Sequence, residues 1–380
     1  MKIIVAIDSL KGSLTSLEAG EAAREGILSA SPKSDVKIFP LADGGEGTCR
    51  TIIAGLGGKL KSVEVTDPLG GKVSAEFGEV LDKKLAVIEM ANAAGLPLVP
   101  EHLRNPLNPT TYGVGELIKI AIADGCRNFV IGIGGSATND CGLGMLTALG
   151  YKFNQQLTAN SQQLIFGRDL EKISAIDDSK VLPELKECKF RIACDVTNPL
   201  TGSNGCSAIY APQKGATPGI VSTMDGWIKN FGELSAKFLN LEKKSVAGDG
   251  AAGGLGFAFR SFLRGELLPG VELVLDALNI AQDLKSADVV ITGEGRLDSQ
   301  TAQGKAPSGV AKLAKKLNPK ILTIGIGGSV ADISDDAGID AAFAILREPM
   351  TLADAMKKNI AAKNISATIE QIIRLIERTR

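Results

Sequence analysis

The sequence predicts an α/β protein of two domains, and three observations support this. The chain has 380 residues, which is more than one ordinary domain core needs. Both of its ends alternate short apolar strands with helical segments, which is typical of a doubly wound parallel sheet covered by helices. The middle of the chain differs, because Lys72–Val80 alternates apolar and polar residues as a half-exposed antiparallel strand does.

The N-terminal end begins with a predicted β-α-β unit. Residues 2–7, KIIVAI, form an apolar strand, and residues 36–39 form a second one. Between them, small and apolar residues recur at helical spacing from Ala19 to Ala30, and Thr15 with Glu18 matches a capping box. This order of elements favours a parallel sheet.

The C-terminal end repeats the same pattern. Strands are predicted at residues 288–292, 321–326 and 341–346, and isoleucines between 365 and 376 form the apolar stripe of a last helix. We therefore place one discontinuous domain at residues 1–67 plus 285–380, and an inserted mixed α/β domain at residues 68–284. The active site is expected in the cleft between them, where small-molecule sites concentrate.

Composition excludes several classes of protein. The formal net charge of -1, without charge blocks, argues against a nucleic-acid binder. No run of about 18 uncharged apolar residues occurs, so we expect a cytoplasmic protein with no membrane partner. His102 is the only histidine and the six cysteines form no CxxC pair, which argues against a histidine-based metal site and a histidine-dependent hydrolase.

The hexapeptide IGIGGS occurs twice, at residues 131–136 and 324–329. In the first copy a strand leads into a tight glycine turn, and Ser136 is predicted to begin a helix whose N–H groups and dipole favour an anion. The residues expected to hold that phosphate are Gly134, Gly135, Ser136, Ala137, Thr138 and Asn139. A plain strand-to-helix turn is the first alternative, and a nicotinamide site is the second. No carboxylate about 20 residues further on supports the nicotinamide site. The second copy lacks the polar residues and is expected to be a strand-end turn.

Charged residues stand in glycine- and proline-bearing loops, several of them at predicted strand ends. They include Asp8, Lys11, Asp43, Asp195, Lys214, Asp249, Glu294, Arg296 and Asp298. Each alone is more often a turn or capping residue than a catalytic one. Together with anion-binding glycine turns, and without histidine, they indicate phosphoryl transfer assisted by Mg²⁺.

These motifs resemble the bacterial glycerate kinases that are neither P-loop, actin-like nor ribokinase-like kinases. The resemblance covers nearly the whole chain and includes DSLKGS, PLADGGEGT, IGIGGSATNDCGLG, CDVTNPLTG and DVVITGEGRLDSQTAQGKAP, in that order. Leu10, Cys141 and Cys206 depart from the common pattern by small changes. The resemblance implies the two-domain glycerate kinase fold, in which a flavodoxin-like domain is split between the chain ends and a second domain is inserted.

The resemblance also implies an activity, namely phosphorylation of D-glycerate by ATP and Mg²⁺, typically at the 2-hydroxyl to give 2-phosphoglycerate. On this basis Asp195 takes the hydroxyl proton, although it could instead cap the turn that follows it. Lys11 and Arg296 hold the glycerate carboxylate or the phosphoryl group. Asp8, Ser9 and Asp43 contact the substrate, residues 134–139 bind ATP phosphates, and Asp298 or Glu294 reaches Mg²⁺.

Three rival functions remain open. They are a kinase or phosphatase for a related hydroxy acid, a non-catalytic nucleotide-responsive regulator, and an NAD-dependent dehydrogenase. The expected partners are D-glycerate and ATP alone, and the chain is expected to be a monomer or a homodimer.

Overall fold

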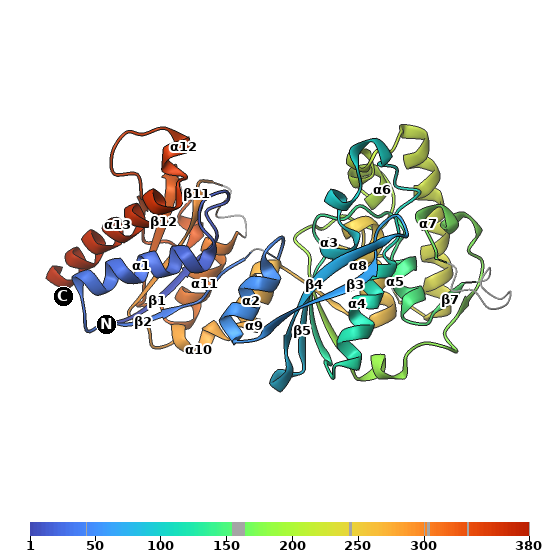
Figure 1. Ribbon diagram of the computed structural model, residues 1–380, viewed down its shortest axis with the longest axis horizontal. Helices are drawn as coiled ribbons and strands as arrows, with labels where there is room; N and C mark the ends of the chain where they lie inside the picture. The colour runs from blue at the N-terminus through green and yellow to red at the C-terminus, as the bar shows by residue number, and fades with distance from the viewer. Residues whose placement is uncertain are drawn as a thin grey trace. The chain divides into compact units, whose positions relative to one another are not determined.

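The computed structural model describes residues 1–42, 44–153, 164–242, 245–299, 301, 305–332 and 334–379. The chain divides into two compact units (Figure 1). The first comprises Met1–Asp43, Ala54–Leu56 and Val271–Arg380, and the second comprises Gly44–Ile53 and Gly57–Gly270. The expected boundaries at 67/68 and 284/285 fall later in the chain than these. The strand β3 (Lys59–Thr66) accounts for the first difference, because it pairs with β4 (Lys72–Val80) in the sheet of the second unit.

The first unit contains a five-stranded sheet in which every pairing is parallel. Its strands are β1 (Lys2–Ile7), β2 (Asp35–Ile38), β11 (Val289–Leu297), β12 (Leu322–Val330) and β13 (Ala341–Ala344). Their spatial order is β13-β12-β11-β1-β2. If these strands are counted along the chain, that is the flavodoxin-like order 2-1-3-4-5. The predicted doubly wound parallel sheet is confirmed.

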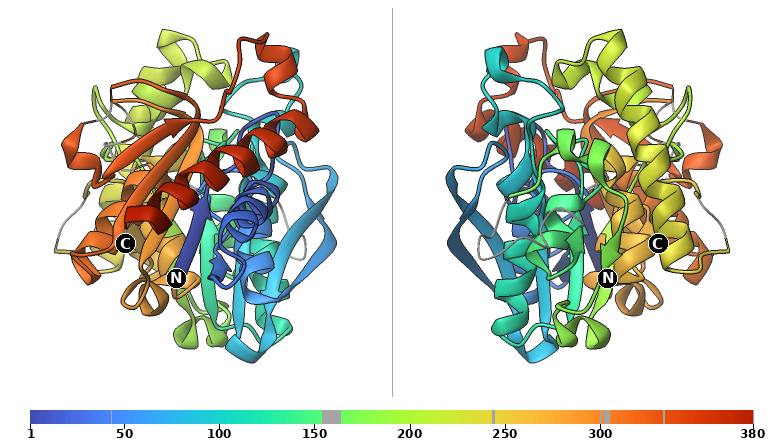
Figure 2. Two further views of the ribbon diagram at one scale, coloured as in Figure 1. Left: turned by 90° about the vertical axis from the view of Figure 1, so that its left-hand side faces the viewer. Right: turned by 90° about the vertical axis from the view of Figure 1, so that its right-hand side faces the viewer.

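Helices cover both faces of this sheet. On one face, α1 (Ser16–Ala30) and α13 (Lys358–Thr379) lie side by side (Figure 2), and their apolar stripes share a core with Ile3 and Val5 of β1. Ile4 and Ala6 alternate with these residues and therefore face the other side, where α11 (Ala306–Leu317) contacts β1 and β11. The capping box of Thr15 and Glu18 at the start of α1 is confirmed.

β11 and β12 continue past their predicted ends because they pair with each other along their whole length. Glu294 lies opposite Gly327, and Arg296 lies opposite Ser329. Glu294 and Arg296 are therefore strand residues, not loop residues. The turn predicted for the second IGIGGS copy is wrong, because that copy lies inside β12.

The second unit is a mixed α/β structure. Its six-stranded sheet has the order β10-β9-β6-β5-β4-β3, and the remaining strands are β5 (Leu85–Glu89), β6 (Asn128–Gly132), β9 (Lys189–Ala193) and β10 (Glu266–Leu268). β4 pairs antiparallel with both of its neighbours, which confirms the alternating pattern of Lys72–Val80, whereas β5, β6, β9 and β10 are parallel. A separate pair, β7 (Lys152–Phe153) and β8 (Ile176–Asp177), is antiparallel.

The remaining α-helices connect the strands of the two units. They are α2 (Thr48–Leu56), α3 (Ala91–Ala94), α4 (Tyr112–Ala123), α5 (Leu143–Ala148), α6 (Cys206–Tyr210), α7 (Pro218–Phe238), α8 (Ala251–Leu263), α9 (Gly270–Ala277), α10 (Ile280–Leu284) and α12 (Leu352–Ala355). Within the part of the chain that the structure describes, no helix combines the length and apolar character that crossing a bilayer requires.

Candidate active site

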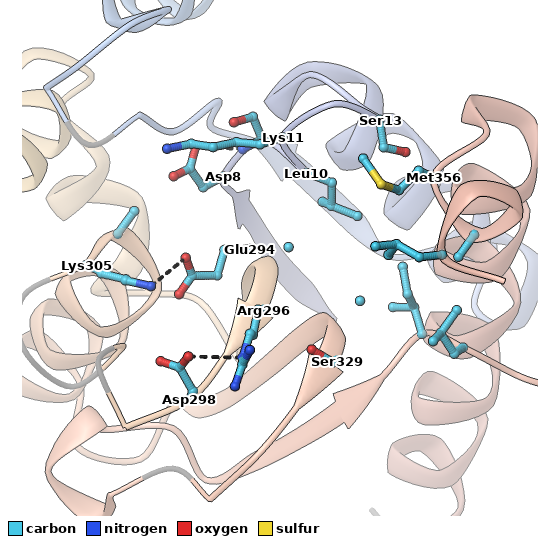
Figure 3. Close-up of a pocket in the computed structure, with 18 residues that line it drawn as sticks. Asp8, Leu10, Lys11, Ser13, Glu294, Arg296, Asp298, Lys305, Ser329 and Met356 are labelled. Carbon is cyan, nitrogen blue, oxygen red and sulfur yellow. Dashed lines mark hydrogen bonds and ion pairs between the residues drawn. The ribbon is translucent and has the colours of Figure 1, made fainter. Parts of the chain in front are cut away.

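A cavity of about 600 Å³ lies at the carboxyl ends of the first unit's strands (Figure 3). It is lined by Asp8, Ser9, Leu10, Lys11, Ser13, Glu294, Gly295, Arg296, Asp298, Lys305, Ala306, Gly328, Ser329, Ile345, Leu346, Leu352, Ala355 and Met356. The loop after β1 and the end of β11 both contribute. Strand order reverses between these two neighbouring strands, and such switch points are where open α/β sheets bind ligands.

Acidic and basic side chains gather at one side of this cavity. Lys305 Nζ lies 3.5 Å from Glu294 Oε2, and Arg296 Nε lies 3.1 Å from Asp298 Oδ2. Asp8 directly follows β1, and its Oδ1 accepts a hydrogen bond from the Ser9 amide at 2.6 Å. Figure 3 shows these side chains pointing into the same space, with Lys11 beside Asp8.

The position of Glu294 is fixed by a buried threonine. Thr301 Oγ1 donates to Glu294 Oε1 at 3.0 Å and accepts a hydrogen bond from the Asp298 amide at 3.0 Å. Burial raises the pKa of Glu294, and the charge of Lys305 opposes that rise. Sequence reasoning missed Thr301 and Lys305 as site residues. In the sequence, these two residues were marked only by following Glu294 within the same segment.

Most residues predicted to contact the substrate or Mg²⁺ are brought together here. Asp8, Ser9, Lys11, Glu294, Arg296 and Asp298 all line the cavity. Asp43 lies outside the described residues. Asp195 and residues 134–139 belong to the second unit.

The first IGIGGS copy differs from its prediction. β6 ends at Gly132, and the next helix begins at Leu143, so the helix predicted to start at Ser136 is wrong. The polar residues after Ser136 fold inward instead of opening a helix. Asp140 is fully buried and accepts hydrogen bonds from the amides of Thr111, Gly142 and Gly144.

A buried lysine forms hydrogen bonds to this segment. Lys214 is 2% exposed, and its Nζ donates to Ser136 Oγ at 2.8 Å and to the Thr138 carbonyl at 2.6 Å. Burial lowers the pKa of Lys214 to about 8. Ala137, Thr138 and Asn139 are buried as well, which leaves Gly134 and Gly135 as the exposed part of the predicted phosphate-binding stretch.

Gly134 and Gly135 line a second cavity, of about 610 Å³, that belongs to the second unit. The glycine loop of residues 44–47, residues of α2, β4, β5 and α3, and residues 97–98 also line it. Glu89, at the end of β5, lies opposite Gly132 of β6 in the parallel pairing. Its Oε1 accepts a hydrogen bond from the Cys49 amide at 2.7 Å, and burial raises its pKa. Sequence reasoning missed Glu89 because it stands 45 residues before Gly134 in the chain.

Asp195 follows β9, as predicted. It is exposed, and its Oδ1 accepts a hydrogen bond from the Gly270 amide at 2.8 Å. That bond fixes the carboxylate while leaving the side chain accessible to solvent.

The charged cavity of the first unit contains the carboxylates of Asp8, Glu294 and Asp298. Among the described residues, no group of three or more histidine, cysteine or acidic side chains is arranged to hold a metal by itself. Mg²⁺ usually takes one or two protein carboxylates and completes its shell with substrate phosphates and water. Glu294 and Asp298 can supply two such carboxylates.

Comparisons with known proteins show the family of this chain. The model of the glycerate kinase family matches residues 3–377. A glycerate 2-kinase of Escherichia coli K12 is 45% identical over 97% of this chain and 98% of its own length. A glycerate kinase of Halalkalibacterium halodurans is 44% identical over 96% of this chain and 97% of its own length.

A solved structure agrees as well. It comes from Salmonella typhimurium LT2, where it is assigned as a candidate glycerate kinase 2, and it is 42% identical to this chain. It superposes with a TM-score of 0.89 and covers 100% of this chain and 99% of its own. The match of family model, sequence and fold along the whole chain leaves one conclusion, that this protein is a member of the glycerate kinase family.

Proposed function

We propose that the protein transfers the γ-phosphoryl group of ATP, bound with Mg²⁺, to the 2-hydroxyl of D-glycerate and releases 2-phosphoglycerate. The observation that carries the proposal is the first unit's cavity, where Asp8, Glu294 and Asp298 stand with Lys11, Arg296 and Lys305. The names of the relatives, glycerate kinase and glycerate 2-kinase, support the acceptor and the hydroxyl.

The basic residues have a direct role in this reaction. Phosphoryl transfer is catalysed by positioning and by neutralising charge on the phosphoryl oxygens, and fixed cations supply that neutralisation. Lys11 and Arg296 bind the glycerate carboxylate or the transferring phosphoryl group. Lys305 reaches the same space and, through its ion pair, orients Glu294.

The acidic residues divide between metal binding and proton transfer. Glu294 and Asp298 would hold Mg²⁺, which when bound would supply positive charge that offsets the negative charge at the transferred group. Asp195 accepts the proton of the attacking hydroxyl, as an ionised aspartate does in other kinases. The amides of Gly134 and Gly135 bind ATP phosphate oxygens.

One experiment tests the proposal. The purified protein is incubated with ATP, MgCl₂ and D-glycerate, and phosphorus NMR identifies the product as 2- or 3-phosphoglycerate. L-Glycerate, tartronate and glycerol serve as competing acceptors. Omission of MgCl₂ should abolish ADP formation, and absence of ADP with every acceptor would contradict the kinase proposal.

The cellular location that fits this reaction is the cytoplasm, because a cytoplasmic location would supply the ATP.

A further inference from the structure

The cavity of the first unit has an apolar end that glycerate and phosphate do not need. Leu10, Ile345, Leu346, Leu352, Ala355 and Met356 contribute its surface. In Figure 3, Met356 lies across the cavity from Lys305 and Asp298. The cavity therefore has a charged side and an apolar side.

Two of these apolar side chains are unusually exposed. Leu352 is 75% exposed and Leu346 is 42% exposed. Exposed apolar surface costs roughly 25 cal/mol per Å², and its concentration beside a cavity indicates a site that a ligand covers. The volume of about 600 Å³ falls within the range of pockets for ligands much larger than a three-carbon acid.

One polar atom stands within reach of this apolar surface. Ser13 Oγ is buried, and among the described residues it has no hydrogen-bond partner. Ser13 also lines the cavity. A buried hydroxyl without a partner is destabilising. A ligand with a polar edge on an otherwise apolar body would supply the missing hydrogen bond. A heterocyclic base has that chemistry.

We propose that the apolar end of this cavity binds the nucleobase of the phosphoryl donor. The base packs against Leu346, Leu352 and Met356, and the terminal phosphate extends toward Lys11, Arg296 and Lys305. This inference rests on the proposed function, since it assumes a nucleotide donor. Aliphatic side chains recognise a flat base by packing, so adenine and guanine nucleotides bind with similar affinity.

The test compares a ligand that has a base with one that lacks it. Titration calorimetry with Mg²⁺ measures the Kd of ADP and of inorganic tripolyphosphate for the wild type and for Leu352→Ser. The variant should weaken ADP binding about tenfold, the effect of losing one buried leucine contact, and leave tripolyphosphate binding unchanged. Lys305→Met should weaken the binding of both ligands.

A matched control comes from the same unit. Leu375 is a leucine of α13 that is 61% exposed and does not line the cavity, so Leu375→Ser should change neither Kd. An unchanged Kd of ADP in Leu352→Ser would overturn the inference, and so would an equal loss for both ligands.

The outcome for the base site is separable from the outcome for the kinase reaction. Calorimetry is done without glycerate, so a base-dependent effect of Leu352→Ser supports the inference even if no glycerate is phosphorylated. Conversely, phosphorylation with the same KM for ATP in the wild type and in Leu352→Ser overturns the inference and leaves the kinase proposal standing.

Discussion

The ammonium of Lys305 lies 3.5 Å from the carboxylate of Glu294, and Thr301 holds the other oxygen of that carboxylate at 3.0 Å. The acid is 15% exposed, so its charge is poorly solvated and depends on these two partners. In the proposed function, this oriented carboxylate is one of the two that would hold Mg²⁺.

Replacement of Glu294 by glutamine tests this role. The amide keeps the size of the side chain and can still accept the Thr301 hydrogen bond, but it loses the charge that would hold Mg²⁺. We expect kcat to fall by ~10²-fold or more and the Mg²⁺ concentration for half-maximal rate to rise. Glu25→Gln, on the exposed side of α1, is the control and should behave as the wild type. A normal Mg²⁺ dependence in Glu294→Gln would assign the metal to another acid.

Asp195→Asn tests the proton acceptor. The asparagine oxygen can still accept the Gly270 hydrogen bond, but it is too weak a base for the hydroxyl proton. Turnover should fall by ~10²-fold or more while the calorimetric Kd of ATP stays unchanged. Asp82→Asn, an exposed change in the same unit, should keep full turnover. Near-normal turnover in Asp195→Asn would transfer the role to a different carboxylate.

Gly134→Ala tests the exposed glycine turn. The backbone of Gly134 is not left-handed, and the nearest atom to an added Cβ is Gly45 Cα at 3.9 Å, so the protein tolerates the methyl group. The methyl group would occupy cavity space beside the amides and keep a phosphate oxygen from reaching them. KM for ATP should therefore rise about tenfold. KM for D-glycerate should not change.

The control for this glycine is Gly226 of α7, which is exposed and has no atom within 4 Å of an added Cβ. Gly226→Ala should leave both KM values as they are. A rise in KM for D-glycerate alone in Gly134→Ala would assign the turn to the glycerate carboxylate.

Lys214 predicts a pH effect on stability. Burial lowers its pKa from 10.5 to about 8, so between these values the unfolded chain binds more protons than the folded one. Stability from this site therefore rises with pH in that window, and the cost of burying the ammonium is fully present below pH 8. The change is on the order of 3 kcal/mol.

Urea unfolding of the wild type and of Lys214→Met at pH 7 and pH 10 measures this effect. The unfolding free energy of the wild type minus that of Lys214→Met should be larger at pH 10 than at pH 7. Two titratable groups act on Lys214: Cys206, whose pKa burial raises to about 11, above that window, and Asp140, whose pKa burial also raises. Both are present in the wild type and in Lys214→Met. A difference that is equal at both pH values would contradict the burial of a charged lysine.

The sequence by itself determined the features that neighbouring residues encode. The capping box before α1, the apolar stripe of α13 and the alternation of Lys72–Val80 each lie within one segment, so each was readable there. The gathering of Asp8 and Glu294 also followed from the sequence, because carboxyl ends of parallel strands meet at one edge of a sheet.

Only the tertiary structure decided how distant segments complete these sites. Ser136 begins no helix, because Asp140 turns inward to three amides and Lys214 approaches from 78 residues away in the chain. Leu352 and Met356 reach the cavity of Asp8 from the other end of the chain. Local propensity depends on adjacent residues, whereas burial and cavity shape depend on contacts between residues far apart in sequence, so the lining of each site emerged only once the chain was folded.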